Sequence, residues 1–424
     1  MSRDRKPVVI IGAGVVGLTL AHGLKKVREC SCHAPAISLV IAVLTLYKLG
    51  VPFQIYERDE HIKSRGQGWA ITLHWILPFL KEMLSEDTFK DVESVQVDPQ
   101  AASLGKFVFI NLETLEPKFL IPPGDRRRVN REKLRKVLLK GVSEHVHWSK
   151  RLASIEEKGD GVVAGFEDGT QADGSLIVGV EGSNSRTRKF LAPESYKNIP
   201  LPIRFTGASV DLTPEQVKPL KDIDPLLFQG CHPVTGAFFW FSMLETPQVN
   251  GTAGTDQERY RVQIMISWPV KTPDDEVKST DLERLANMKK RASDFNPVLR
   301  DVVQLIPDGS EVIEVVLQDW PCLPWDNRNG KVTLAGDAAH AMTMYRGEAA
   351  NHGLLDAHRL CRALDMVYNQ GKSLKVAVDR YETELRERTS TAVLLSRQAC
   401  LDAHDFAGLN ENSAVLKRRA ISLV

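Results

Sequence analysis

Short runs of apolar, mostly β-branched residues recur at wide intervals along the 424-residue chain. Residues 8–11 (VVII), 176–180 (LIVGV) and 330–335 (GKVTLA) each have the length and composition of a strand buried on both faces. Such strands are typical of parallel sheets covered by helices. The chain is therefore predicted to have an α/β fold.

Other stretches have the period of amphipathic helices or of half-buried strands. Apolar positions within residues 128–141 (RVNREKLRKVLLKG) fall on one helix face, and Gly141 is a natural stop. Further helices are expected at residues 77–83, 280–292, 351–368 and 374–397. Strands are expected at residues 107–120, which could form a hairpin, and at 146–148, 152–156 and 162–166, which suggest a small meander.

The character of the chain changes between about residues 201 and 323. Apolar and polar residues alternate at residues 238–243 and 261–268, which favours an antiparallel sheet with one buried face. The aromatic residues concentrated there suit the wall of an apolar substrate pocket and an ordinary core about equally well.

Three glycines follow the first apolar run with the spacing of a dinucleotide-binding loop. Gly12 allows a tight turn, Gly14 lets the backbone approach a pyrophosphate, and Gly17 lets the next helix pack close to the strand. The N-terminus of that helix presents N–H groups to phosphate. The sequence predicts a dinucleotide site here, with a glycine-rich turn in an ordinary βα unit as the alternative.

The acidic residue expected about 20 positions after this loop comes late. Glu57 ends the second strand, 40 residues after Gly17, and removal of residues 27–48 restores a spacing of 18. We hypothesise that these 22 residues are an insertion and a translated, unspliced intron, because they preserve the frame and their end codons permit splice-site letters. Transcripts that always retained these codons would contradict the intron. A natural helical extension is the alternative.

Charge and cysteine content narrow the class of protein. Lysine and arginine total 55 against 54 acidic residues, so nothing indicates a nucleic-acid partner, and the basic runs 126–128 and 417–419 are expected on solvated faces. Six scattered cysteines favour a reducing compartment, and Cys30, Cys32 and His33 are not expected to bind metal. The apolar run at 34–47 is too short to span a membrane, so a cytoplasmic protein is expected.

Three separated motifs together resemble the para-hydroxybenzoate-hydroxylase-like FAD-dependent monooxygenases, in particular the fungal secondary-metabolite type. They are the glycine loop with Glu57, the segment GVEGSNSRTR, and GDAAHAMTMYRGEAANHGLLDAHRL. The resemblance implies a Rossmann-like FAD-binding domain in two parts, residues 1–190 (with 27–48 as an atypical insertion) and 326–395. It also implies an inserted antiparallel-sheet substrate domain at 191–325 and a C-terminal tail at 396–424.

The resemblance also implies roles for individual residues. Gly12, Gly14 and Gly17 would hold the FAD pyrophosphate, and Glu57 the adenosine ribose. The other residues expected at the cofactor are Gly68, Arg131, Asp337 and Ala350. NAD(P)H would dock transiently as reductant, and O₂ and an apolar or aromatic small molecule would be the other substrates. No catalytic side chain is identified; Arg186, Arg188 and His340 are candidates that structural roles would also explain.

The chain departs from the family pattern at several positions. Glu181 and Gly182, after Val180, stand where Asp-Gly is usual. Ala341 and Met344 replace prolines and Ala349 replaces a glycine, which is expected to loosen the loop over the flavin and to crowd a close approach. Two alternatives to an active monooxygenase therefore stay open: a flavin oxidase or dehydrogenase, and a degenerate or misspliced flavoprotein with little activity.

Overall fold

The structure is a computed structural model that describes residues 6–26, 50–64, 68–101, 107–120 and 125–417. The expected insertion at 27–48, the apolar run at 34–47, the trio Cys30, Cys32 and His33, and Arg418 and Arg419 lie outside the described residues. Among the described helices, none combines the length and the apolar character needed to cross a membrane.

A five-stranded parallel sheet organises the first part of the fold. Its strand order is β19 (Val332–Leu334), β11 (Leu176–Gly179), β1 (Val8–Ile11), β2 (Phe53–Tyr56) and β7 (Val146–His147). The three apolar runs of the sequence are neighbours in it, and all side chains of β1, β11 and β19 are buried. The predicted α/β fold is confirmed.

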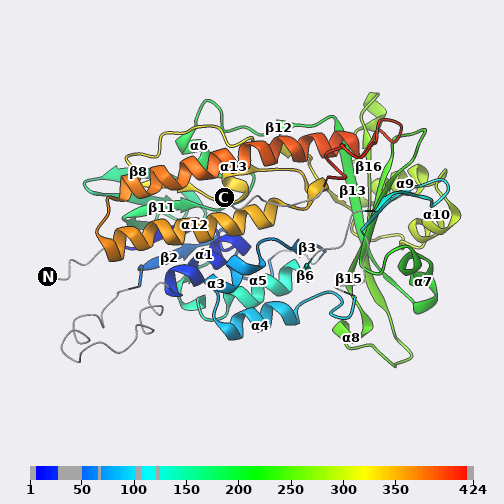
Figure 1. Ribbon diagram of the computed structural model, residues 1–424, viewed down its shortest axis with the longest axis horizontal. Coiled ribbons are helices and arrows are strands. Elements are labelled where there is room, and N and C mark those ends of the chain that lie inside the picture. Colours follow the sequence, from blue (N-terminus) through cyan, green and yellow to red (C-terminus); the bar gives the residue numbers. More distant parts are fainter. Residues whose placement is uncertain (1–5, 27–49, 65–67, 102–106, 121–124, 418–424) are drawn as a thin grey trace.

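Helices from distant parts of the sequence pack against this sheet and against one another (Figure 1). α1 (Val15–Lys26) contacts both α5 (Arg131–Leu139) and α12 (Ala349–Gln370). A methyl group on Gly23 of α1 would collide with the sulfur of Cys361 on α12. Further helices of this part are α3 (Leu77–Met83), α4 (Glu86–Ser94), α6 (Arg186–Leu191) and α11 (Asp337–His340).

The helix predicted at residues 128–141 begins later than expected. A strand, β6 (Arg127–Asn130), comes first and pairs antiparallel with β3 (Ala70–Leu73). The side chain of Asn130 then accepts hydrogen bonds from the backbone N–H groups of Glu132 and Lys133. Asparagine is a favoured N-cap, so α5 starts at Arg131.

The predicted meander is only partly correct. β8 (Leu152–Lys158), β9 (Gly161–Phe166) and β10 (Gln171–Gly174) do form an antiparallel three-stranded sheet. β7 instead pairs parallel with β2 at the edge of the five-stranded sheet. A run of only two or three residues has too little periodicity to show which partner it takes.

The second part of the fold is built on a seven-stranded sheet. Its order is β17 (Ile313–Glu314), β13 (Ile203–Leu212), β16 (Tyr260–Pro269), β15 (Phe238–Glu245), β14 (Leu227–Cys231), β4 (Val108–Asn111) and β5 (Pro117–Leu120). All neighbours are antiparallel except β14 and β4. The expected hairpin within residues 107–120 is present, and it extends this sheet although it precedes residue 191. β12 (Ile199–Pro200) and β18 (Gln318–Asp319) form a separate pair.

The expectation of one buried face on this sheet is wrong, because both faces are covered. On one side lie α7 (Pro214–Ile223), α9 (Asp281–Arg291) and α10 (Pro297–Gln304), with α8 (Pro247–Asn250) nearby (Figure 1). On the other side, Met265 of β16 shares a core with residues from α13 (Leu374–Asp402) and with Leu409 and Val415 beyond it. Residues that looked like a tail thus complete a core.

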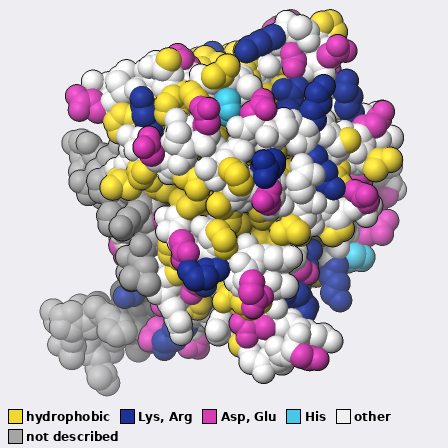
Figure 2. Space-filling view, turned by 90° about the vertical axis from the view of Figure 1, so that its right-hand side faces the viewer, with side chains coloured by type: hydrophobic (Ala, Val, Ile, Leu, Met, Phe, Trp, Pro, Cys, Tyr) yellow, Lys and Arg dark blue, Asp and Glu magenta, His cyan; other side chains and the backbone are white. Residues whose placement is uncertain are grey.

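The charge pattern can be followed on the face that carries these outer helices. Figure 2 shows acidic and basic side chains intermixed there with apolar ones. Acidic and basic residues are almost equal in number in the whole chain, which has a net charge of +1.

A buried chain of hydrogen bonds ties the end of α13 to the sheet. The Tyr345 hydroxyl donates to Ser267 Oγ at 2.8 Å, and Ser267 Oγ lies 2.8 Å from His404 Nε2. His404 Nδ1 lies 2.7 Å from the carbonyl oxygen of Cys400. These partners assign the proton of His404 to Nδ1, which leaves Nε2 to accept from Ser267. Burial lowers the pKa of His404 to about 4.

We expect this histidine to make folding stability depend on pH. Between the pKa of an unfolded histidine, about 6.5, and about pH 4, only the unfolded chain binds the proton, so the free energy of unfolding falls as pH falls. A shift of this size corresponds to about 3 kcal/mol lost by pH 4. Urea unfolding at pH 7 and pH 5 should show a smaller loss for His404→Gln than for the unchanged chain.

The matched control is His61→Gln, because His61 is exposed on the surface. This variant should lose as much stability between pH 7 and pH 5 as the unchanged chain. Equal losses for His404→Gln and the unchanged chain would contradict the role given to His404.

Candidate active site

The glycine loop has the close backbone packing that its spacing predicted. Gly12 has φ +117°, and a Cβ there would lie 2.7 Å from the carbonyl oxygen of Val180. A Cβ on Gly17 would collide with the carbonyl oxygen of Gly12, so only glycine lets α1 approach β1 this closely. By contrast, a Cβ on Gly14 would meet no protein atom within 4 Å, and Gly14 lines a pocket.

Glu57 lies at the end of β2 directly beside this loop, despite the long spacing in the sequence. It is 2% exposed, and its Oε2 accepts a hydrogen bond of 2.7 Å from the backbone N–H of Ala13. Arg135 Nη2 lies 3.4 Å from the same oxygen. The carboxylate therefore holds the loop in shape while it borders the pocket.

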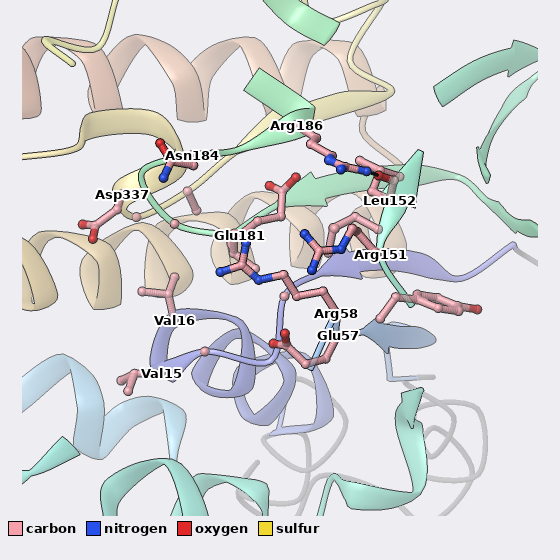
Figure 3. A pocket seen from close by; sticks show the side chains of 18 of the residues that line it. Val15, Val16, Glu57, Arg58, Arg151, Leu152, Glu181, Asn184, Arg186 and Asp337 are labelled. Atoms are coloured by element: carbon pink, nitrogen blue, oxygen red, sulfur yellow. Dashed lines mark hydrogen bonds between the residues drawn. The ribbon is translucent and has the colours of Figure 1, made fainter. Parts of the chain in front are cut away.

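The pocket has a volume of about 290 Å³ and runs from Glu57 to the N-terminal end of α12. Figure 3 shows Asp337 and Asn184 on one side of it and Arg151, Leu152 and Arg186 on the other. Asp337 is open to the pocket but surrounded by protein, and this burial raises the pKa of its carboxyl. Gly12, Gly14, Glu57, Arg131, Asp337 and Ala350 all line this pocket.

Two predicted residues lie elsewhere. Gly17 is at the contact between α1 and β1, behind the loop. Gly68 lines a neighbouring cavity of about 360 Å³, and its carbonyl oxygen accepts a hydrogen bond from Gln263. Arg131 borders both spaces, so it connects them.

The sequence did not reveal the positive side of the pocket. Arg58, Lys150, Arg151 and Arg186 line it from three separate segments. Arg186 is engaged with Glu167 and with the carbonyl oxygen of Leu152. Arg186 belongs to the GVEGSNSRTR motif, but no motif marks Arg58, Lys150 or Arg151, and only the fold brings the four cations together. Their charge suits an anionic ligand.

Three of the residues that depart from the family pattern are compatible with the local structure. Glu181 accepts hydrogen bonds from the hydroxyls of Ser185 and Thr187 and from the N–H of Thr187, so its side chain is used at the start of α6. Ala341 has φ −54°, close to the value that proline would impose. Ala349 is the first residue of α12, where a side chain causes no strain.

The remaining catalytic candidates have structural roles. Arg188 is 1% exposed and donates to carbonyl oxygens that include those of Tyr196 and Asp337. His340 Nε2 lies 2.6 Å from Asp356, and Arg388 donates to the same carboxylate at 2.7 Å. Burial alone would raise the pKa of Asp356, but the charges of His340 and Arg388 hold it below its ordinary value.

Another cavity, distinct from the one at Gly68 and called the second cavity from here on, has a volume of about 170 Å³. It lies between the seven-stranded sheet and the β3–β6 pair. It shares Ile71, Ala349 and Ala350 with the first pocket, so the two spaces meet at the start of α12. Six aromatic side chains line it: Trp69, Phe107, Phe205, Phe238, Trp240 and Tyr345.

The basic run at residues 126–128 is not the solvated face that we expected. Arg126 and Arg128 line the second cavity, and Arg128 is only 5% exposed. Alternation along β6 explains the difference, because successive side chains of a strand point to opposite faces. Arg127 points the other way and pairs with Glu93 and Asp125.

Three kinds of comparison relate this chain to known proteins: a family model, relatives in sequence and solved structures. Residues 107–396 match the family described as FAD binding domain. The FAD-dependent monooxygenase dbaB of Emericella nidulans is 44% identical over 361 residues, which cover 84% of this chain and 86% of that protein. The FAD-dependent monooxygenase tazP of Aspergillus terreus is 35% identical over 390 residues, with 87% and 91% covered.

A solved structure shares the fold. It is Klebsiella pneumoniae HpxO in complex with FAD and uric acid, and it aligns with a TM-score of 0.70 at 18% identity. The alignment covers 95% of this chain and 90% of that one.

One added methyl group is expected to have opposite effects at Gly14 and at Gly17. Gly14→Ala should leave the unfolding free energy of the apoprotein within about 0.5 kcal/mol, because the methyl meets no protein atom. It should weaken FAD binding about tenfold or more, about 1.4 kcal/mol, because it occupies the pocket. Urea unfolding and a titration of FAD fluorescence measure the two effects.

Gly17→Ala is the counterpart. Alanine gains about 1 kcal/mol of helix propensity over glycine. The collision with Gly12 should cost more than that and leave a net loss of stability of about 1–3 kcal/mol. Tight FAD binding by Gly14→Ala would show that the loop does not hold the cofactor.

Proposed function

This chain belongs to the family of FAD-dependent monooxygenases, and we propose that it uses NAD(P)H and O₂ to hydroxylate or epoxidise an apolar or aromatic small molecule. The observation that carries the proposal is the junction of the two cavities at Ile71, Ala349 and Ala350. A pocket bordered by the glycine loop and by charged side chains, suited to a dinucleotide, meets an aromatic cavity suited to a substrate there.

The residues of the first pocket fit FAD. The open face of Gly14 would receive the pyrophosphate, with Gly12 and Gly17 fixing the loop around it. Glu57 would accept hydrogen bonds from the adenosine ribose, and Asp337 from a ribityl hydroxyl. Arg131 would lie at the phosphates. Gly68 would lie beside the flavin at the neighbouring cavity.

The start of α12 would then face the flavin ring. Its first N–H groups have no acceptor within the helix, and no described side chain caps them. The positive end of a 22-residue helix at Ala349 and Ala350 would stabilise negative charge on the reduced ring. Bound FAD, reduced by NAD(P)H, would supply the oxygen-transfer chemistry with O₂.

The chain's own contribution at the second cavity would be placement and exclusion of water. Aromatic walls, which include Phe205, Phe238 and Trp240 of the seven-stranded sheet, would hold the substrate against the junction, and a dry cavity protects reactive species from hydrolysis. The relatives are fungal proteins, which supports a role in secondary-metabolite biosynthesis.

The visible spectrum of the purified chain tests the cofactor, and a version without residues 27–48 tests the insertion. We expect flavin bands in both proteins. On either side of the segment, β1 and β2 pair in register and Glu57 meets Ala13, so the loop is complete in the full chain. Flavin in the shortened protein alone would favour the misspliced alternative, and flavin in neither would overturn the cofactor assignment.

Oxidation of NADPH or NADH in air separates the monooxygenase from the oxidase. We expect the FAD-loaded protein to consume one of them together with O₂, and small aromatic compounds to stimulate the rate. A protein that consumes neither, but whose flavin is reduced directly by an organic substrate, would contradict the proposed reductant.

A further inference from the structure

Arg128 is held at the wall of the second cavity by neutral groups. Its Nε and Nη2 donate to Ser242 Oγ at 3.1 and 2.6 Å, and its Nη1 donates to Thr72 Oγ1 at 2.9 Å. A guanidinium has five N–H groups. One on Nη1 and one on Nη2 therefore have no acceptor among the described residues.

Among the other buried arginines, Arg188 donates its N–H groups to four carbonyl oxygens and to Asn198. Arg135, Arg346 and the nearly buried Arg388 have carboxylate partners instead. Arg135 lies 3.4 Å from Glu57, Arg346 donates to Glu348 at 2.8 Å, and Arg388 donates to Asp356 and Glu384. Arg128 has no ion pair with a described carboxylate, and none of the described residues that line its cavity is acidic.

The neighbouring charge that shifts the pKa of Arg128 has the same sign as Arg128 itself. Burial, together with the positive charge of Arg126, lowers the pKa of Arg128 to about 9. The acid that acts on Arg126 is Asp224, whose oxygens already accept the N–H groups of Phe107, Leu226 and Leu227. A buried cation without a counter-ion is costly unless a ligand supplies one.

The remainder of the cavity suits a flat ring. The guanidinium carbon of Arg128 lies 5.8 Å from the ring centroid of Trp240, and further aromatic side chains line the same cavity. The cavity thus combines mostly apolar walls with the positive charge of two arginines, Arg126 and Arg128.

We propose that the second cavity selects aromatic molecules that carry an anionic oxygen, a carboxylate or an ionised phenol, and that Arg128 binds that oxygen. The two remaining N–H groups can donate to it as a pair. This inference rests on the proposed function only in taking the second cavity as the substrate site.

Arg128 would also fix how the ring is turned. It donates to the Thr72 hydroxyl, and the carbonyl oxygen of Thr72 accepts a hydrogen bond of 2.9 Å from Asn351. Asn351 follows Ala350 on the first turn of α12. An anionic oxygen on Arg128 is therefore anchored relative to the junction of the cavities, which makes Arg128 a residue that determines specificity and orientation.

Calorimetric titration of the FAD-loaded protein tests this inference. FAD fills the first pocket, so its cations cannot take up the probe. The probes are 1-naphthoate and 1-naphthamide, which have similar shape and differ in charge. We expect the unchanged chain to bind the carboxylate about 10- to 100-fold more tightly, as for a hydrogen bond to a charged group. Titration of 4-nitrophenol below and above its own pKa tests the ionised phenol in the same way.

Three variants assign the preference to its residue. Arg128→Met should bind both naphthalene probes within about twofold of each other, since the charge is gone. Arg128→Lys should keep part of the preference, because it retains charge but loses the paired donors. Arg127→Met is the matched control, because Arg127 is the next residue on β6 and pairs with Glu93 and Asp125 outside the cavity. It should leave the preference unchanged.

Equal binding of the two naphthalene probes by the unchanged chain would overturn the inference, as would a preference that survives in Arg128→Met. If Arg128→Met fails to hold FAD, the comparison of probes on the unchanged chain and on Arg128→Lys still decides. Loss of NADPH oxidation with an intact preference would contradict the proposed function alone. Oxidation without any preference would contradict this inference alone.

Discussion

The contact between Gly12 and Gly17 sets the position of everything around the first pocket. No side chain fits between the carbonyl oxygen of Gly12 and the start of α1, so the helix lies directly on β1. That closeness brings the N–H of Ala13 to Glu57 at the end of β2. Because α1 also packs on α12, the same contact fixes the helix end where the two cavities meet.

Sequence patterns predicted the parts of the fold that depend on local chemistry. The buried runs of β1, β11 and β19 and the glycine loop were correct because length, composition and spacing suffice for them. The extent of α13 and the second covered face of the large sheet were missed. Both depend on residues near the C-terminus that pack on strands far away in sequence, which no local period records.

The candidate site divides in the same way. Residues in motifs, such as Asp337, could be placed at the pocket from the sequence. The cations Arg58 and Arg151 could not, because they come from two separate segments that only the fold brings together. Arg128 was misjudged because three consecutive arginines look like a solvated run. Its partner, the hydroxyl of Ser242, is 114 residues away.

Arg128 and Arg388 show that arginine has two different roles in this fold. Arg388 meets two carboxylates, Asp356 and Glu384, and these raise its pKa; it is part of a closed network that holds α12 and α13 together. Arg128 meets Ser242 and Thr72 hydroxyls, which orient a guanidinium without neutralising it. The guanidinium of Arg128 is therefore held in place at the cavity wall while its positive charge stays uncompensated. This arrangement is expected where a ligand supplies the counter-ion.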